Sequence, residues 1–566
     1  MHNYKNLTFA SIIPDVVSKY AANKALGFVD EEPVTYAQMG KMIIAVIAFM
    51  ENAGIKPDDK VVIYSQNMPN WGIVYFALHC MGVVAVPVLP DFNTHELNNV
   101  LNHSEAKVIF ISKSLQHRLK ETESGFIETI IQLDHFEVME SKIPGLEFNK
   151  QAVPSRTYTP DENKMAVLLY TSGTTGNSKG VMLSQKNILS NAYQSSHIQE
   201  IVDTDKFLSV LPMSHTYENT IGLILPILKG AHITYLRKPP TASVLLPALK
   251  KVQPTFMLTV PMIIEKVYRS SILPQIEKKT LSRLMHRFKP TRKIVYRMAG
   301  KKLYETFGGR LKFFGIGGAK LDGQVEQFLR DAKFPYAIGY GLTETSPILA
   351  GSNPSQTKLQ AIGPKAIWCE VKIHNPDPKT GEGEIWAKGP NVMLGYYKNE
   401  EQTKEVLTED GWFKTGDLGV FDKDGWLTHK GRLKNMIVGA NGENIYPEEI
   451  ESLINNFRHV VESIVLEQKG KLVAMVHFNT EELEARVKEM TTSFSNKVDE
   501  TMDRVDGTLD DISKKVDQII EDLTKELKAY VNARVNKISR IQLFIPHKEP
   551  FIKTATKKIK RYLYSK

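Results

Sequence analysis

Short β-branched runs alternate with amphipathic helical patterns in the first part of this chain, and this alternation limits the folds open to it. Apolar runs at residues 61–64, 83–88 and 108–111 are typical of strands, and the patterns at 36–51 and 94–101 are typical of helices. Strands that alternate with helices form parallel sheets whose faces the helices cover. The sequence therefore predicts an α/β protein with layered sheets and helices. The alternation continues at residues 207–211, 231–236, 256–260 and 311–316.

The pattern changes after Ile367, where short strands and Gly-rich turns follow one another, as at residues 381–390 and 422–432. This change predicts a small β-rich subdomain. A chain of 566 residues is also too long for a single core, so two or three domains are expected.

Composition favours a soluble globular protein, with 42% hydrophobic and 24% charged residues. The first residues lack the basic segment, apolar core and small-residue cleavage site of a signal peptide. Cys80 and Cys369 are too few for a disulfide framework and lack metal-ligand spacing. We therefore expect a cytoplasmic protein.

One segment, residues 71–89, carries no formal charge and is long enough to span a bilayer. Gly82 and Pro87 interrupt it, and its second half is short and β-branched. We interpret it as a buried helix, a turn and a buried strand. A transmembrane helix is the alternative.

A loop rich in glycine and hydroxyl side chains, residues 170–184, follows the apolar run 165–169. Glycines let backbone N–H groups approach oxyanions, and hydroxyls and a lysine add further donors, so the loop suits a polyphosphate. It is not a Walker A loop, because Ser178 precedes Lys179 and Gly180 follows it. A flexible linker is the alternative, but it leaves the lysine and the preceding strand unexplained. The candidate phosphate contacts are Thr171, Ser172, Gly173, Thr174, Thr175, Gly176 and Lys179.

This loop resembles the signature loop of the adenylate-forming superfamily, which includes acyl-CoA synthetases, peptide-synthetase adenylation domains and luciferases. The resemblance extends from about Tyr36 to Arg561, with several motifs in the family's order. Gly317, Gly318 and Ala319 resemble the small-residue wall beside the adenine ring, where side chains would block a flat base. A tight turn is the alternative for these three residues.

The segment 340–345 (YGLTET) resembles the next family motif. The resemblance implies that Tyr340 stacks on adenine beside Gly341, that Thr343 meets the α-phosphate and that Glu344 binds Mg²⁺, with Thr174 as a second metal contact. Oxygen ligands and bound phosphate are what Mg²⁺ prefers. ATP and Mg²⁺ are therefore expected.

Four residues further along match motifs that, in the family, meet the ribose or move with a C-terminal domain. Asp417 resembles the carboxylate that accepts both ribose hydroxyls, a role that suits an acceptor-only group. Arg432 matches an arginine that also reaches the ribose, and Lys434 falls at the hinge between half-reactions. Gly442 matches the loop that lines the pantetheine channel, which implies coenzyme A.

The final lysine motif, residues 551–561, resembles the one that carries the catalytic lysine of the family, and alignment on Lys-Ile-x-Arg selects Lys558. Lys557 stands where many members have glycine, and a basic solvated tail is the alternative. The resemblance implies an adenylation domain at 1–431 and a small mobile α+β domain at 432–566.

The segment 211–218 (LPMSHTYE) resembles the form found in long-chain fatty acyl-CoA synthetases, with His215 near the reacting carboxylate. Amino-acid-activating members place an Asp in this region, and none occurs between Asp205 and Asp322. The apolar residues at 221–228 suit a lipid tunnel, although core packing predicts the same residues. With its ending, its basic region and its helical insertion, the chain resembles long-chain acyl-CoA synthetases of the Bacteroidetes type.

Positive charge is concentrated at residues 278–302, which contain ten Lys and Arg, while the whole chain has a net charge of +9. Apolar residues are interleaved with these charges, so the element could rest on an anionic membrane surface. An ordinary solvated helix face explains the same pattern. Nucleic acid is a weaker reading and is not expected, because no nucleic-acid motif accompanies the charge.

Residues 481–536 contain no proline and place apolar residues at spacings of three and four, which predicts a long amphipathic, coiled-coil-like helix or a helical hairpin. The stretch is an insertion relative to the family's compact C-terminal domain. We expect an oligomer or partner contact, with any bend near Gly507. Packing on its own domain is the alternative.

The motifs together predict ATP-dependent activation of a long-chain fatty acid and its transfer to coenzyme A. An acyl-ACP synthetase, which differs in the thiol carrier, is the rival within the same class. An inactive membrane-associated scaffold is the rival from another class. The intact set Lys179, Glu344, Asp417, Arg432 and Lys558 argues against a scaffold, because a scaffold does not need these residues.

Overall fold

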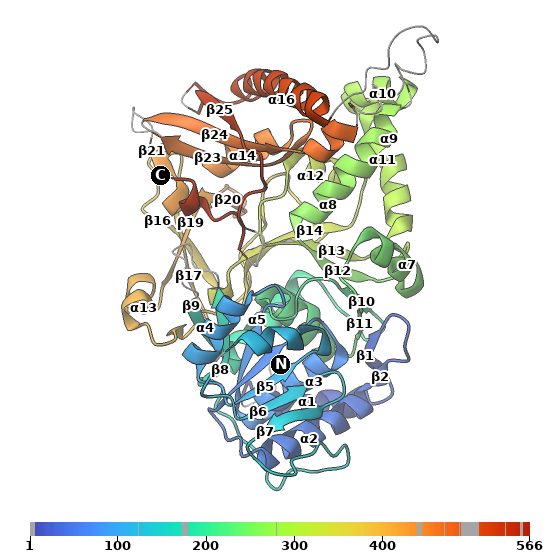
Figure 1. Ribbon diagram of the computed structural model, residues 1–566, viewed down its shortest axis with the longest axis vertical. Helices are drawn as coiled ribbons and strands as arrows, with labels where there is room; N and C mark the ends of the chain where they lie inside the picture. Colours follow the sequence, from blue (N-terminus) through green and yellow to red (C-terminus); the bar gives the residue numbers. More distant parts are fainter. Residues whose placement is uncertain are drawn as a thin grey trace. The chain divides into compact units, whose positions relative to one another are not determined.

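The computed structural model consists of two compact units. Its helices and strands are drawn in Figure 1. The first unit comprises Met1–Thr415 and Val420–His429, and the second comprises Gly416–Gly419 and Lys430–Lys566. A functional boundary at residue 432 stays a prediction. The structure describes residues 6–122, 124–171, 179–278, 280–438, 444–468, 470–485, 487, 509–537, 539–554 and 558–565.

One sheet of the first unit has, in the described part of the chain, eight strands in the order β18-β9-β8-β4-β3-β5-β6-β7. The central strands from β8 to β6 are parallel, and β7, β9 and β18 are antiparallel additions at the two edges. The β-branched runs expected as strands thus lie in a parallel sheet. Their bounds are β3 (Lys60–Tyr64), β4 (Val84–Val88), β5 (Val108–Ile111), β6 (Thr129–Gln132), β7 (Glu137–Ser141), β8 (Met165–Thr171), β9 (Lys179–Ser184) and β18 (Gly395–Tyr396).

The second large sheet has the order β15-β14-β13-β12-β10-β11-β1-β2. Strands β14, β13, β12, β10, β11 and β1 run parallel, so their carboxyl ends share one edge of the sheet. The bounds are β1 (Lys24–Phe28), β2 (Val34–Thr35), β10 (Lys206–Ser209), β11 (His232–Tyr235), β12 (Phe256–Thr259), β13 (Phe313–Ile316), β14 (Tyr336–Gly341) and β15 (Ile348–Gly351).

Two helices lie between these sheets. Helix α3 (Pro69–Met81) contacts β3 and β4 of one sheet and β1 of the other, and every residue from Trp71 to Met81 is buried. Gly82 ends this helix at φ 75°, and β4 follows, so the helix, turn and strand expected at 71–89 are confirmed. Helix α5 (Gln185–Ile198) contacts β8, β9 and β15. Within the described ranges, no helix combines the length and apolarity that crossing a bilayer requires.

The longer remaining helices of the first unit are labelled in Figure 1. The expected helices at 36–51 and 94–101 are α2 (Tyr36–Asn52) and α4 (Thr94–Ser104). The others are α1 (Phe9–Lys19), η1 (Lys113–Glu121), the π-helix η2 (Glu218–Ile224), α6 (Leu225–Leu228), α7 (Ala242–Val252), α8 (Pro261–Val267), the π-helix η3 (Tyr268–Ile272), α9 (Leu273–Lys278), α10 (Thr280–Arg287), α11 (Lys289–Thr306), α12 (Gly323–Asp331), η4 (Thr343–Thr345) and α13 (Glu400–Val406).

The expected β-rich subdomain is a four-stranded sheet in the order β16-β17-β19-β20, whose last two strands contribute residues to both units. The second unit then forms a three-stranded sheet, β23-β24-β25, with α14 packed on β23. The bounds are β16 (Glu370–His374), β17 (Gly383–Lys388), β19 (Phe413–Phe421), β20 (Leu427–Arg432), η5 (Leu433–Asn435), β21 (Ile437–Val438), β22 (Asn444–Ile445), α14 (Pro447–Asn455), β23 (Val460–Gln468), β24 (Lys471–Phe478), α16 (Leu509–Asn532), β25 (Leu543–Pro546) and η6 (Arg561–Leu563).

Helix α16 packs on its own domain. Its buried residues Val516, Leu523, Leu527 and Val531 join one apolar core with residues of α14, β23, β24 and β25. For this part of the predicted insertion, the alternative of packing within the domain is therefore the observed one, and these residues are not a subunit contact. The expected bend at Gly507 lies outside the described residues.

Candidate functional site

The carboxyl edge of the second sheet brings several predicted site residues of the first unit together. The segment with His215 follows β10, Gly317–Ala319 follow β13, and Thr343 and Glu344 follow β14. These strands are parallel neighbours across β12. Ligands of open α/β sheets bind outside the carboxyl ends of the strands, so this edge is the candidate site.

Glycine is required at two positions of this edge. Gly318 has φ +85°, a conformation that other residues rarely adopt. A Cβ at Gly341 would lie 1.8 Å from the carbonyl oxygen of Pro347. At Gly317 a Cβ would lie 3.2 Å from the ring of Tyr217, so a larger residue there would press on that ring. The glycines keep this wall flat, which suits the expected contact with a planar base.

Tyr396, a residue that the sequence analysis missed, contacts both Glu344 and Lys179. The hydroxyl of Tyr396 donates a hydrogen bond to Oε1 of Glu344 at 3.0 Å. The Lys179 ammonium lies 5.0 Å from the centroid of the same ring, at cation–π distance. Tyr396 belongs to β18, more than two hundred residues after Lys179, and no motif in the sequence pointed to it.

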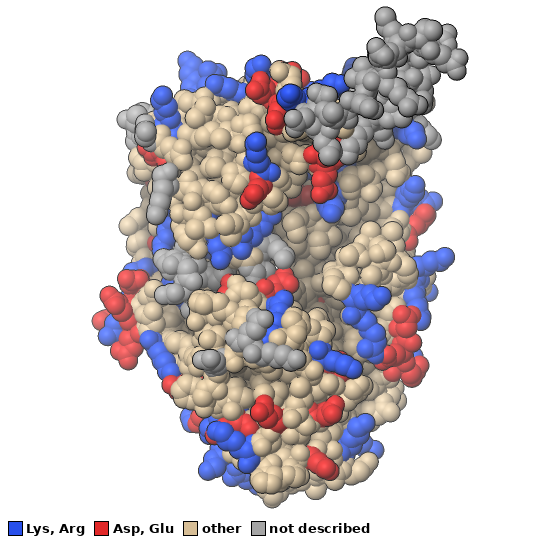
Figure 2. Space-filling model, in the orientation of Figure 1, with Lys and Arg blue, Asp and Glu red and all other residues tan. Residues whose placement is uncertain are grey.

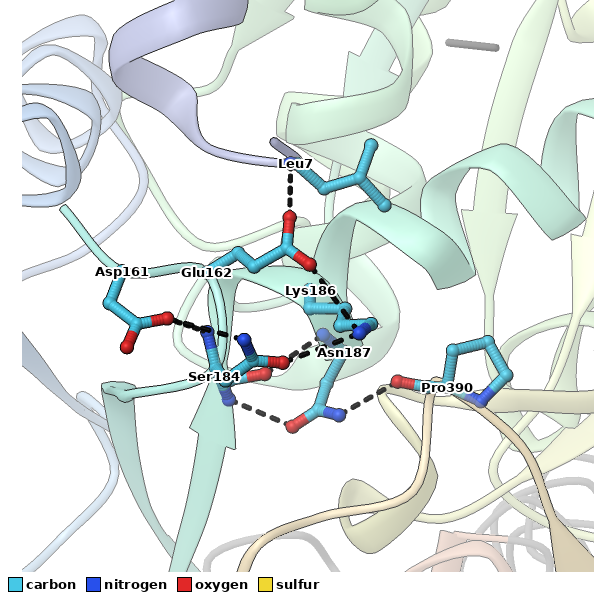
Figure 3. Close-up of polar contacts among 8 residues, drawn as sticks. Leu7, Asp161, Glu162, Ser184, Lys186, Asn187 and Pro390 are labelled. Atoms are coloured by element: carbon cyan, nitrogen blue, oxygen red, sulfur yellow. Dashed lines mark hydrogen bonds and ion pairs between the residues drawn. The ribbon is translucent and has the colours of Figure 1, made fainter. Parts of the chain in front are cut away.

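The phosphate loop connects two paired strands, because Thr171 at the end of β8 is the register partner of Lys179 at the start of β9. Figure 3 shows how β9 continues into α5: Ser184 and Asn187 form a reciprocal cap at the helix start. Asn187 Nδ2 also donates to the carbonyl of Pro390 at 2.7 Å (Figure 3), which ties the strand carrying Lys179 to the chain before Tyr396. Ser172, Gly173, Thr174, Thr175 and Gly176 lie outside the described residues.

The loop before His215 is held by Asn67, a second residue that the sequence analysis missed. The side chain of Asn67 donates to the carbonyl of Leu211 at 2.6 Å and accepts from the backbone N–H of Met213 at 2.9 Å. Nδ1 of His215 accepts a hydrogen bond from the backbone N–H of Tyr217 at 3.3 Å. The imidazole is thus fixed in orientation at the sheet edge.

Glu218 is a buried carboxyl beside this loop. It is 2% exposed and accepts a 2.5 Å hydrogen bond from Ser209 Oγ on its Oε1. Burial raises the pKa of Glu218 from 4.5 to about 8, and the Ser209 hydrogen bond only partly offsets that rise. The side chain is therefore neutral at pH 7.

Replacing Glu218 by glutamine should remove a pH dependence of stability. The folded pKa of about 8 lies above the value of 4.5 for the exposed group, so the folded protein holds a proton that the unfolded chain releases. The free energy of unfolding of the wild type should fall by about 1.4 kcal/mol per pH unit between these values, relative to Glu218→Gln. Urea unfolding at several pH values measures this difference. The control is the exposed Glu409→Gln, and equal pH profiles for wild type and Glu218→Gln would contradict the prediction.

In the second unit, the two predicted ribose contacts lie together. Nε of Arg432 is 2.8 Å from Oδ1 of Asp417, whose side chain is only 3% exposed. Lys434 is exposed on η5, and Gly442 lies outside the described residues.

Lys558 is exposed and directly precedes Ile559, which forms an antiparallel bridge with Lys553. Lys553 itself is 2.5 Å from Glu462 in an ion pair. Arg561 pairs with Glu451 and holds the end of the chain on α14. Of the lysines described in this motif, Lys558 is therefore the exposed one, while Lys557 lies outside the described residues.

A magnesium ion at this site would need ligands from its substrate. Among the described residues, no group of three His, Cys, Asp or Glu is arranged to hold a metal ion. Glu344 offers a carboxylate at the edge, and Mg²⁺ is commonly bound by one or two carboxylates together with phosphate oxygens and water. The residues present fit that mode.

Comparison with known proteins decides the family. The model of the AMP-binding enzyme family matches residues 14–397, more than half of the chain. The chain belongs to this family. It is 29% identical to peroxisomal long chain acyl-CoA synthetase 6 of Arabidopsis thaliana, over 81% of this chain and 70% of that one. It is 28% identical to a long-chain-fatty-acid–CoA ligase of Mycobacterium tuberculosis, over 80% and 78% of the two chains.

Solved AMP-binding enzymes share the fold. The O-succinylbenzoate coenzyme A synthetase of Bacillus subtilis, in complex with AMP, superposes with a TM-score of 0.73 at 22% identity, covering 97% of each chain. A benzoate CoA ligase from Burkholderia xenovorans gives a TM-score of 0.75 at 18% identity, covering 99% of this chain and 100% of that one. The expected α/β architecture of an adenylate-forming enzyme is thus confirmed.

Proposed function

We propose that this AMP-binding enzyme activates a long-chain fatty acid with ATP and then transfers the acyl group to coenzyme A. The observation that carries the proposal is an apolar cavity directly behind the carboxyl edge of the second sheet. It is lined by Tyr217, Ile221, Leu258 and Gly315, among others. Tyr217 in this lining is two residues from His215, so the apolar walls suit the part of a hydrocarbon chain next to the reacting carboxylate. Relatives named as long-chain acyl-CoA synthetases and ligases support the same substrate class.

In the first half-reaction a carboxylate oxygen attacks the α-phosphorus of ATP, and the bond to pyrophosphate breaks. Lys179 and its loop hold the leaving phosphates, and Lys558 offsets the charge between carboxylate and α-phosphate. Mg²⁺, held by Glu344 and Thr174, would neutralise phosphate charge. Tyr340 and the Gly317–Ala319 wall receive the adenine, and Asp417 with Arg432 receives the ribose. The main contribution of these residues is to hold the carboxylate and the α-phosphate in line for the attack.

In the second half-reaction a thiol attacks the carbonyl of the acyl-adenylate, and AMP leaves. We place the hinge at Lys434 and the boundary of the mobile domain at residue 432. Movement about this hinge withdraws Lys558 and brings the Gly442 loop to the pantetheine. One active site is thereby used for two reactions.

The test is a pyrophosphate-release screen with ATP and saturated acids from acetate to eighteen carbons. We expect a preference for chains of roughly twelve carbons or more, because each buried methylene contributes about 0.8 kcal/mol. Comparable turnover of acetate, or activation of free amino acids, would refute the proposal. No pyrophosphate release from any acid would favour the inactive scaffold.

Acyl carrier protein is a second candidate for the thiol that accepts the acyl group. A chloroplastic long-chain-fatty-acid acyl-carrier-protein ligase of Arabidopsis thaliana is 28% identical over 83% of this chain, as similar as the CoA ligases. Adding coenzyme A or holo carrier protein separately to fatty acid and ATP distinguishes the two. Acyl transfer to the carrier protein alone would replace coenzyme A in the proposal.

We further propose a cytoplasmic enzyme that attaches to the inner face of the membrane through α10 and α11. Apolar side chains of these helices face solvent: Leu281 is 70% exposed, Leu284 55% and Met298 72%. Residues 278–302 contain no acidic residue, whereas acidic and basic side chains alternate over much of the face drawn in Figure 2. Exposed apolar groups ringed by Lys and Arg fit an anionic lipid surface.

Charge reversal should remove this attachment. The variant Arg283→Glu, Arg287→Glu, Arg297→Glu should lower binding to vesicles containing phosphatidylserine at least about tenfold, since each basic residue contributes about 1 kcal/mol at such a surface. Sedimentation with vesicles measures the binding. The control reverses the exposed residues Lys41, Lys113 and Lys150, and should change binding little. Equal losses in both triple variants, or no binding by the wild type, would overturn the assignment of this surface.

A further inference from the structure

Two hollows of the first unit share one lining side chain. The inner cavity lies against β12, β13 and β14, and the outer groove lies between α1, α5 and α6. Leu225, at the start of α6, lines both of them. Other residues of the inner cavity are Ile198, Tyr217, Ile221, Leu258, Gly315 and Gly339. Other residues of the outer groove are Ile12, Val16, Lys19, Ala192, Leu228 and Lys229.

The inner cavity is too small for a long acyl chain. Its volume is about 40 Å³, which holds roughly three water molecules on the usual measure. Pockets that bury drug-sized ligands have volumes of roughly 300 Å³ or more. The outer groove has about 280 Å³, with mostly apolar walls and the alkyl stems of Lys19 and Lys229. A chain that fills the inner cavity therefore finds its next space beyond Leu225.

The backbone on both sides of Leu225 is anchored. Before it, Tyr75 donates to Asn219 and Thr220 donates to the carbonyl of Ser346, each at 2.8 Å. After it, the hydroxyl of Tyr36 donates to the carbonyl of Ala231, also at 2.8 Å. These buried contacts fix where the segment lies, so the space between the hollows depends on the leucine side chain.

The helix changes from π to α geometry at Leu225. The N–H of Leu225 bonds to the carbonyl of Thr220, five residues back, at the end of the π-helix η2. Pro226 follows and has no N–H to donate, so the helix is not continued regularly. Single π-turns of this kind are frequent at functional sites.

We propose that Leu225 is the partition that sets acyl chain length, and that chains too long for the inner cavity place their methyl end in the outer groove. This rests on the proposed function, with the carboxylate at the sheet edge near His215. The outer groove then belongs to the substrate site and accepts the distal methylenes of long-chain acids. Leu225 is a specificity-determining residue, because its volume decides how easily the chain passes.

The experiment compares three variants across acids of two to twenty carbons. Leu225→Ala removes the partition and should raise the ratio of kcat/KM for eighteen against four carbons about tenfold, the factor expected from two further buried methylenes. Leu225→Phe fills the passage and should lower the same ratio by a similar factor. Leu223→Ala is the matched control: the same change two residues earlier, in a buried residue that lines neither hollow. It should leave the ratio unchanged.

Ratios between substrates cancel a general loss of active protein, and thermal unfolding of each variant identifies one that fails to fold. If the Leu225→Ala variant does not fold, the opposite shift in Leu225→Phe still tests the proposal. An unchanged ratio in the folded Leu225 variants, or an equal shift in Leu223→Ala, would overturn it. Failure of the wild type to activate any fatty acid would instead overturn the proposed function, so the two outcomes are distinguishable.

Discussion

Replacing Lys558 by alanine should lower acyl-adenylate formation by about 10² to 10³-fold while transfer from supplied acyl-adenylate remains largely intact. The loss is that expected when one preorganised electrostatic contact to a developing charge is removed. The charge of Lys558 is needed only while the carboxylate attacks the α-phosphate. Lys558 is exposed, whereas the neighbouring Lys553 is held in its ion pair with Glu462. Pyrophosphate release measures the first half-reaction, and thioester formation from acyl-adenylate measures the second.

Lys560→Ala is the matched control, because it removes the same charge two residues further on. It should change adenylation little. An equal loss in both half-reactions for Lys558→Ala would show that another lysine, such as Lys557, has the catalytic role. Full adenylation activity of Lys558→Ala would likewise contradict the assignment.

Replacing Glu344 by glutamine should lower adenylation by about 10²-fold and raise the Mg²⁺ concentration needed for half-maximal rate. The substitution keeps the shape and the hydrogen bond from Tyr396 but removes the negative charge that a divalent cation needs. A Mg²⁺ titration of pyrophosphate release measures both effects. Binding of the fatty acid should not change.

Tyr396→Phe is the control that separates the orientation of Glu344 from its negative charge. It removes the donor that orients Glu344 and keeps the ring beneath Lys179, so a loss of only about tenfold is expected for one hydrogen bond to a charged group. If Glu344→Gln keeps most of its rate, or if Tyr396→Phe costs more than Glu344→Gln, the carboxylate is not the metal contact.

Local patterns were sufficient for most of the sheet strands and for the order of the motifs. The run at 108–111 is β5 as expected, and 71–89 is a buried helix followed by a strand, because strand and helix preferences there agree with burial. The sequence also showed the apolar repeat of α16, but it did not show which residues this repeat packs against. Spacing shows that a stripe must be covered, while the residues that cover it come from α14 and the sheet of the same unit.

What the sequence by itself determined is the α/β architecture and the identity of the motif residues at the ends of strands. Only the tertiary structure joined Tyr396 to Glu344, Asn67 to the loop before His215, and Leu225 to two hollows. These partners are separated by long stretches of chain and come from different elements, so no period or local spacing relates them. Preference for helix or strand is encoded within a few neighbouring residues, whereas the contacts that shape this site depend on which strand ends the fold brings to one edge.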